Sequence, residues 1–172
     1  MAKQPTLRPS DLVVACQLAI TPAAKFLQVA NSTGLSAGEC HNAVRRLRLA
    51  RIILATERRP AIEILHQFLI HGAPFAFPPV LGLKTIGTAT AHSAPAFSAL
   101  IESSDGFVWP DASGTARGQS LTPLFPGASS LPVRNNALYE MLSIVDALRV
   151  GTARVRKIAA DLLRERLAGS RA

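Results

Sequence analysis

The residues whose types and spacing could do chemistry gather between positions 36 and 59. Arginine can bridge the edge of guanine through two hydrogen bonds, and asparagine can do the same to adenine. Small side chains let a helix approach a groove closely, and basic side chains neutralise phosphates. This combination is typical of a helix that binds the major groove of double-stranded DNA. The chain presents it as Ser36, Ala37, Gly38, His41, Asn42, Arg45, Arg46 and Arg48, followed by Arg58 and Arg59.

Two short helices joined by a tight turn must position these side chains. Residues 27–33 show a short helical pattern that breaks at Gly34, a residue type that readily adopts the positive φ such a turn requires. Ser36 then has the type of an N-cap, and Glu39 three residues later completes a capping box. We therefore expect a second helix from Ala37 onward.

The second helix is amphipathic, which separates a buried face from an outward face. Apolar residues recur at helical spacing and predict the buried stripe, so the polar and basic residues named above face outward. A surface helix whose basic face is merely solvated is the alternative. The preceding helix, the glycine turn and the capping box favour DNA binding. The predicted stripe consists of Cys40, Ala43 or Val44, Leu47 and Ala50.

The segments on either side extend this unit. Ser10 is the expected N-cap of a first helix over residues 11–20. Residues 51–60 form a short β-rich run that ends in two arginines and a proline, which is typical of the small wing of a winged helix. A wing lays basic side chains along the DNA backbone, so Arg58 and Arg59 are candidates for phosphate contacts. A solvated turn is the alternative for each of them.

The character of the chain changes after the next expected helix, residues 61–71. Residues 75–95 are rich in proline, glycine, threonine and alanine, so we expect an extended stretch without helix. In it, Pro78 and Pro79 should prevent further sheet pairing. A Pro-Asp-x-x-Gly turn ending at Gly114 predicts a small β-hairpin. The middle of the chain is therefore expected to be a β-rich insert.

Two helices are expected at the end of the chain. Asn136 is the expected N-cap of a helix that runs through Leu148, and Thr152 that of a last helix to about Leu167. Both have an apolar stripe, and their tight connection at Gly151 predicts an antiparallel pair. We expect this pair to form the interface of a homodimer.

These elements predict a mainly α fold with a small β component (α+β) in three parts. They are an N-terminal winged helix-turn-helix over residues 1–72, an extended or β-rich insert over 73–135 and a C-terminal helical hairpin over 136–172. The net charge of +8 fits a polyanionic partner. Residues 1–72 carry nine Lys or Arg against four acids, and residues 134–172 carry eight against four, so the basic excess lies at both ends.

Other kinds of site are not indicated by the sequence. The histidines lack metal-ligand spacing, and no phosphate-binding glycine loop, nucleophile elbow or carboxylate pair appears, so we expect no metal, no cofactor and no enzyme. No apolar run approaches the roughly 20 residues of a membrane helix. We expect a cytoplasmic protein with reduced, buried Cys16 and Cys40. Aromatic residues such as Phe77 and Trp109 could line an effector pocket, although a packed core is the more usual place for them.

Residues 10–59 resemble the winged helix-turn-helix of MarR-like bacterial transcription regulators, through the pattern LxVANSTGLSxGExxNAVRRL. The resemblance implies a transcription regulator that binds an operator. The insert departs from that family, which has no counterpart to residues 75–131. The phrases FAFPP, TAHSAP and VWPD look like small bacterial helix-turn-helix proteins of toxin-antitoxin or defence operons. That second resemblance implies a protein partner, such as a cognate toxin, for the insert and the C-terminal helices.

The sequence therefore predicts a homodimeric, sequence-specific double-stranded DNA-binding transcription regulator. An antitoxin or adaptor that binds protein through the same module is the alternative. Two-fold operators match two-fold proteins, and one module buries little surface, which is why a homodimer is expected. Base edges should be met by Ala37, Gly38, His41, Asn42 and Arg45. Phosphates should be met by Ser36, Arg46, Arg48, Arg58 and Arg59.

Overall fold

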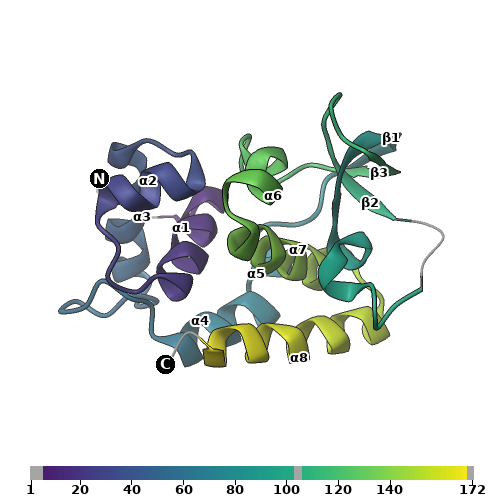
Figure 1. Cartoon of the computed structure of the whole chain (residues 1–172). Coiled ribbons are helices and arrows are strands. Elements are labelled where there is room, and N and C mark those ends of the chain that lie inside the picture. Colours follow the sequence, from purple (N-terminus) through teal and green to yellow (C-terminus); the bar gives the residue numbers. More distant parts are fainter. Residues whose placement is uncertain (1–5, 103–105, 170–172) are drawn as a thin grey trace.

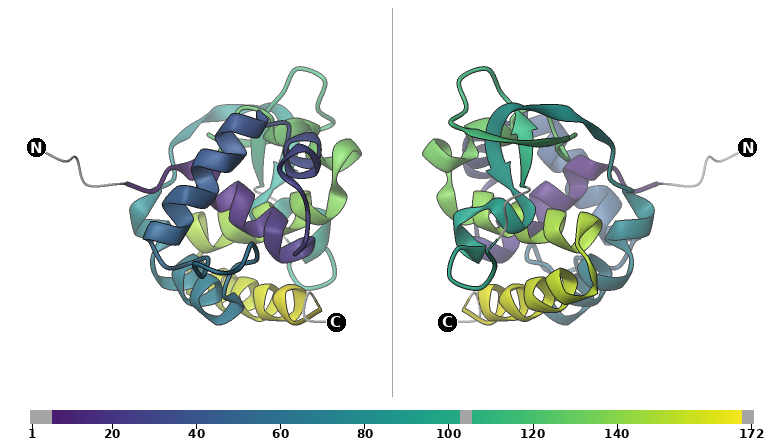
Figure 2. Two further views of the ribbon diagram at one scale, coloured as in Figure 1. Left: turned by 90° about the vertical axis from the view of Figure 1, so that its left-hand side faces the viewer. Right: turned by 90° about the vertical axis from the view of Figure 1, so that its right-hand side faces the viewer.

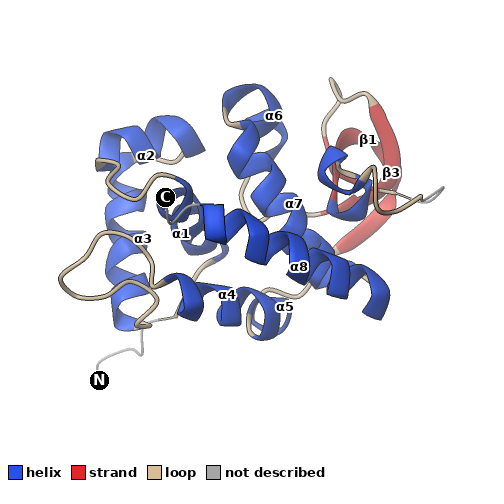
Figure 3. Cartoon of the chain, turned by 60° about the horizontal axis from the view of Figure 1, so that its bottom comes forward, coloured by secondary structure: helices blue, strands red, loops and turns tan. Residues whose placement is uncertain are grey.

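Two groups of elements lie at opposite ends of the molecule, and a central helix joins them (Figure 1). The computed structural model describes residues 6–102 and 106–169. Helices α1 to α3 form one end, a small sheet forms the other, and helix α7 runs between them. Figure 3 shows that the strands gather at one end, whereas helices form the rest. The fold is α+β, as the sequence predicts.

Helix α1 (Pro9–Ile20) is buried along nearly its whole length because α2, α3 and α7 all pack on it. It begins earlier than expected: Arg8 and not Ser10 is the N-cap, and the backbone N–H of Arg8 donates to the Asp11 carboxylate over 2.8 Å. Pro9 occupies the first turn, where its missing N–H costs nothing.

The turn between α2 (Phe26–Thr33) and α3 (Ala37–Leu49) has the predicted chemistry. Gly34 ends α2 with a φ of 82°, in the left-handed region. The backbone N–H of Ser36 donates to Glu39 Oε2 over 2.9 Å, and the N–H of Glu39 donates to Ser36 Oγ over 3.2 Å. The glycine turn and the capping box are therefore both confirmed.

The segment after α3 is a loop closed at its base. Ile53 and Pro60 form an isolated antiparallel bridge, and the N–H of Ala61 donates to the carbonyl of Ile52 over 2.9 Å. We call residues 53–60 the bridged loop. It leads into helix α4 (Ile62–His71), close to the predicted bounds.

Two local predictions for the following segment are wrong. Residues 75 and 76 are helical, because a short helix α5 (Ala73–Ala76) continues from α4 with a proline in its first turn. Pro78 and Pro79 do not prevent sheet pairing, since strand β1 (Leu81–Thr90) begins two residues after them. The prolines end the helix and set the chain into the extended conformation from which β1 starts.

The sheet is not the predicted hairpin. Strands β2 (Phe107–Pro110) and β3 (Ala116–Leu121) both pair antiparallel with β1 and parallel with each other, so the three strands close into a small barrel. β1 is long enough for β2 to pair with its end and β3 with its beginning. A side chain on Gly87 would overlap the backbone of Trp109, so closure requires glycine there.

Helix α7 (Asn136–Val150) is the centre of the molecule, and its residues from Leu138 to Arg149 are buried except Glu140. It packs against α1, α4, α5, β1 and the 3-10 turn Ala91–Ser93 that follows β1. The short helix α6 (Leu131–Arg134) precedes it, and the side chain of Asn135, not Asn136, caps it by accepting from Leu138 N–H over 3.2 Å.

Helix α8 (Ala153–Gly169) packs antiparallel on α7, as predicted, and also contacts α4. An ion pair of 2.7 Å joins Arg166 near its end to Glu140 near the start of α7. Val155 N–H donates to Thr152 Oγ1, the predicted cap. The apolar stripes of both helices are therefore used within the chain, where one continuous core connects all three parts expected from the sequence.

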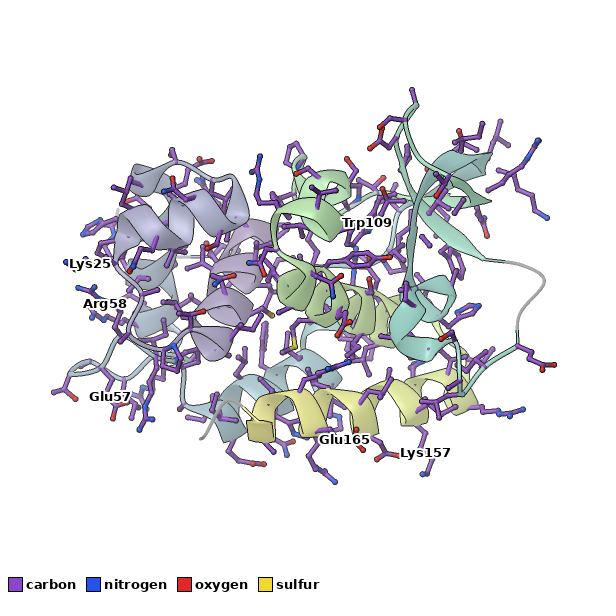
Figure 4. All side chains as sticks on the ribbon, viewed as in Figure 1. Lys25, Glu57, Arg58, Trp109, Lys157 and Glu165 are labelled. Atoms are coloured by element: carbon purple, nitrogen blue, oxygen red, sulfur yellow. The ribbon has the colours of Figure 1, made fainter. Side chains whose placement is uncertain are left out.

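Asp146 and Arg149 form a buried ion pair within α7, and hydrogen bonds from the sheet to Asp146 join the pair to the strands. The Asp146 carboxylate accepts from Arg149 Nη1 over 2.6 Å, from Trp109 Nε1 over 2.7 Å and from Thr90 Oγ1 over 2.9 Å. Burial raises the pKa of Asp146, and Arg149 and the other donors oppose that rise. Arg149 also donates through Nε to the Phe77 carbonyl over 2.8 Å. Figure 4 shows Trp109 between the helices and the strands.

Replacing Arg149→Met should destabilise the protein by about 3–5 kcal/mol, because the Asp146 carboxylate is then buried without its counter-charge. Urea unfolding followed by the fluorescence of Trp109 measures this loss. The double variant Asp146→Leu/Arg149→Met removes both charges and should lose less than the single variant. A single variant that loses under about 1 kcal/mol would contradict this role for the pair.

Replacing Gly34→Ala should cost about 1–2 kcal/mol, because a residue with a Cβ is strained at positive φ. Gly38→Ala is the matched control, since Gly38 lies inside α3 and its Cβ would meet nothing within 4 Å. That change should stabilise the protein by about 0.5–1 kcal/mol. Equal effects of the two changes on chemical denaturation would refute the explanation.

Candidate nucleic-acid interface

Helix α3 lies across one face of the molecule, as the left view of Figure 2 shows. The apolar stripe points inward as predicted for Cys40, Ala43, Val44 and Leu47, whereas Ala50 is exposed because it lies just beyond the end of the helix. The outward face carries the small and polar residues from which DNA contacts are predicted. The exposed members are Ser36, Ala37, Gly38, His41, Asn42, Arg45 and Arg48.

A groove of about 430 Å³ runs between α2, α3 and the bridged loop. Cζ of Arg58 lies 5.0 Å from the ring centroid of Phe26, a cation–π contact, and the ring of His41 meets the same ring edge-on at 5.4 Å. The start of α2 thereby holds the bridged loop against α3. The groove is lined by Phe26, His41, Val44, Arg45, Arg48, Leu49 and Arg58.

Sequence reasoning missed Phe26. It contributes to the groove through its ring, which contacts both Arg58 and His41. The only signal for it was an aromatic residue at the start of a helix next to Lys25, and nothing in that pattern says which distant side chains it meets. Figure 4 shows Lys25, Arg58 and Glu57 along one edge of the molecule.

Glu57 brings a carboxylate into the basic loop. It forms an exposed ion pair of 2.9 Å with Arg59, and its backbone carbonyl accepts from Arg48 Nη2 over 3.1 Å. Exposed pairs of this kind contribute little to stability. Arg48 and Arg59 can therefore exchange these partners for phosphate oxygens at small cost.

Arg46 differs from the other predicted contacts. Its Nε and Nη2 donate to the two oxygens of Asp11 over 2.8 and 2.6 Å, and its side chain is only 15% exposed. The hydrogen bonds to Asp11 raise the pKa of Arg46. Arg46 thus joins α3 to α1, and this position gives it a structural role that the sequence pattern does not reveal.

Ser36 is also engaged within the chain. Its Oγ donates to Glu39 Oε2 over 2.8 Å and accepts from the Glu39 N–H. The hydrogen bond from the backbone N–H of Ser36 to the Glu39 carboxylate, and then the one from Ser36 Oγ, lower the pKa of Glu39. The capping box therefore sets the start of α3, where Ala37 and Gly38 present a surface with little side-chain bulk.

The structure shows what surrounds the other candidates. Trp109 and Phe77 are both buried in the hydrophobic core. Burial raises the pKa of the Cys16 thiol to about 12, so this thiol stays protonated. Within residues 6–102 and 106–169, no three His, Cys, Asp or Glu side chains group as metal ligands would. The same part of the chain contains no helix long and apolar enough to cross a bilayer.

Comparisons with known proteins add no relative. No protein-family model, no curated protein and no solved structure matches this chain.

Replacing Arg46→Met should destabilise the protein by about 3 kcal/mol, because the fully buried Asp11 then lacks its counter-charge. Arg45→Met is the matched control: it is the neighbouring residue, it is exposed, and its change should stay within about 0.5 kcal/mol. Thermal and urea unfolding of the two variants measure the difference. Indistinguishable unfolding curves would show that the ion pair is not structural.

Proposed function

We propose that this chain is a sequence-specific double-stranded DNA-binding transcription regulator. In this proposal α1, α2, α3 and the bridged loop form a winged helix-turn-helix, with α3 as the recognition helix and the bridged loop as the wing. The observation that carries it is the exposed face of α3, with small residues at its start and arginines along its length, beside a groove lined by Arg45, Arg48 and Arg58.

The chemistry of each position supports a division of roles. Asn42 and Arg45 are exposed on the same face of α3 and have the side chains that read adenine and guanine. Ala37 and Gly38 allow close approach of the helix to the bases. Arg48 of α3 and Arg58 of the bridged loop line the groove together with His41, and Arg59 follows Arg58 in the loop. The three arginines match phosphates of the DNA backbone. Arg46 stabilises the module through Asp11.

The proposal includes a homodimer, because a single module buries little surface and two-fold operators match two-fold proteins. The interface through α7 and α8 is predicted from the apolar stripes of these helices, and the structure uses both stripes inside the chain. The α7 stripe is buried inside the chain, and the stripe of α8 faces α7 and α4. A dimer interface on these helices would therefore have to use their exposed faces and not the apolar stripes. A monomer at micromolar concentration by light scattering would refute the dimer without affecting the DNA-binding face.

Binding to duplex DNA tests the proposal directly. A pool of randomised duplexes should yield an enriched sequence, and the affinity measured by fluorescence anisotropy should fall steeply with salt. Arg45→Ala/Arg48→Ala should weaken binding by about a hundred-fold or more, since two charged contacts are lost. Arg154→Ala/Arg164→Ala removes the same charge from exposed positions on α8 and should change affinity little.

Two results would contradict the DNA proposal. One is the absence of measurable duplex binding by the wild-type chain at low salt. The other is an equal loss in both double variants, which would reflect only general charge. Unfolding temperatures close to that of the wild type confirm that each variant is folded, as expected for exposed side chains.

A protein-interaction role, as an antitoxin or adaptor, is the second candidate. The observation that favours it is the exposure of apolar side chains on β1, with Leu83 89% and Ile86 50% exposed. Scattered exposed apolar residues are common, but several on one strand are typical of a surface that a partner covers. One variant distinguishes the DNA-binding function from the protein-interaction function. Leu83→Lys should leave duplex affinity unchanged while it weakens binding to such a protein partner.

A further inference from the structure

Arg134 lies beside the turn that precedes α3, although it is far from that turn in the sequence. A methyl group on Gly34 would overlap Nη1 of Arg134 and lie 3.3 Å from its Cζ, so the guanidinium covers the open side of the turn. α6, which carries Arg134, packs against α2. The start of α3 at Ser36 is two residues beyond Gly34.

The chain holds α6 in this position through Asn135. Its Nδ2 donates to Gln17 Oε1 of α1 over 2.7 Å and is 3.5 Å from the carbonyl of Ser32 in α2. Asn135 also caps α7, so one residue fixes α6 relative to α1, α2 and α7. The position of Arg134 is thus set by the packed helices and not by a free tail.

Arg134 itself is exposed and forms no ion pair with any residue in the described part of the chain. This distinguishes it from Arg46, which a carboxylate holds, and from Arg59, which pairs with Glu57. An arginine without a carboxylate partner is free to take a phosphate oxygen.

We propose that Arg134 contacts a backbone phosphate of the DNA at the end of α3 opposite the bridged loop. This inference rests on the proposed DNA-binding function and extends it. Arg48 and Glu57 show that the bridged loop lies at the C-terminal end of α3, while Arg134 lies at the N-terminal end. A duplex along α3 then meets basic side chains at both ends, and one of them comes from the segment that the sequence presents as an insert.

The test compares single variants in the same anisotropy measurement with the enriched duplex and with an unrelated duplex. Arg134→Ala should weaken binding to both duplexes by about ten-fold, since a phosphate contact carries no sequence information. The slope of log affinity against log salt should fall by about 0.9, the value for one phosphate. Arg134→Lys keeps the charge and should retain most of the affinity.

Arg154→Ala is the matched control. Arg154 is exposed near the start of α8, the end of that helix which Figure 1 shows on the opposite side of the molecule from α3. Its removal should leave affinity and salt slope close to those of the wild type. Equal effects of Arg134→Ala and Arg154→Ala would overturn the inference, because they would reflect net charge alone.

The failure of this inference is distinguishable from that of the proposed function. If Arg134→Ala binds like the wild type while Arg45→Ala/Arg48→Ala loses binding, DNA binding stands and the Arg134 contact is refuted. If the wild-type chain binds no duplex, both are refuted. Because Arg134 is exposed, its variants should unfold at the wild-type temperature.

Discussion

The buried carboxylate of Asp146 is the constraint on which the arrangement of this molecule depends. A charge taken out of water is costly unless donors surround it, and here the donors come from different parts of the chain. Arg149 belongs to the same helix, whereas Trp109 and Thr90 come from β2 and β1. The sheet can therefore take one position against α7, because any shift would leave the carboxylate without its hydrogen bonds.

A second buried carboxylate has the same effect at the other end of the molecule. Asp11 in α1 holds Arg46 in α3 through two hydrogen bonds and also accepts the N–H of Arg8. Since α1 packs against α7, the face around α3 belongs to the same frame as the sheet. The outward residues of α3 consequently project from a rigid element, which a surface that reads a groove requires.

Several local signals predicted local structure, although the N-caps expected at Ser10 and Asn136 lie at Arg8 and Asn135. The Ser36 and Glu39 box, the turn at Gly34 and the cap at Thr152 each depend on residues within a few positions, so their outcome is contained in a short segment. The hairpin prediction failed because strand pairing depends on a third partner, β1, which no turn motif reports. Arg46 looked like its neighbours for the same reason, since its partner lies 35 residues earlier.

By itself, the sequence determined where most helices begin and end, which residues of α3 face the core, and that basic side chains follow one another along its outer face. Those properties arise from periodicity, capping and φ preference, which act over one or two helical turns. Only the tertiary structure decided which partner each of these arginines has. It paired Arg46 with Asp11, placed Arg58 over Phe26 and brought Arg134 to Gly34. Such partners are set by the packing of distant elements around one core, so a local sequence pattern does not predict them.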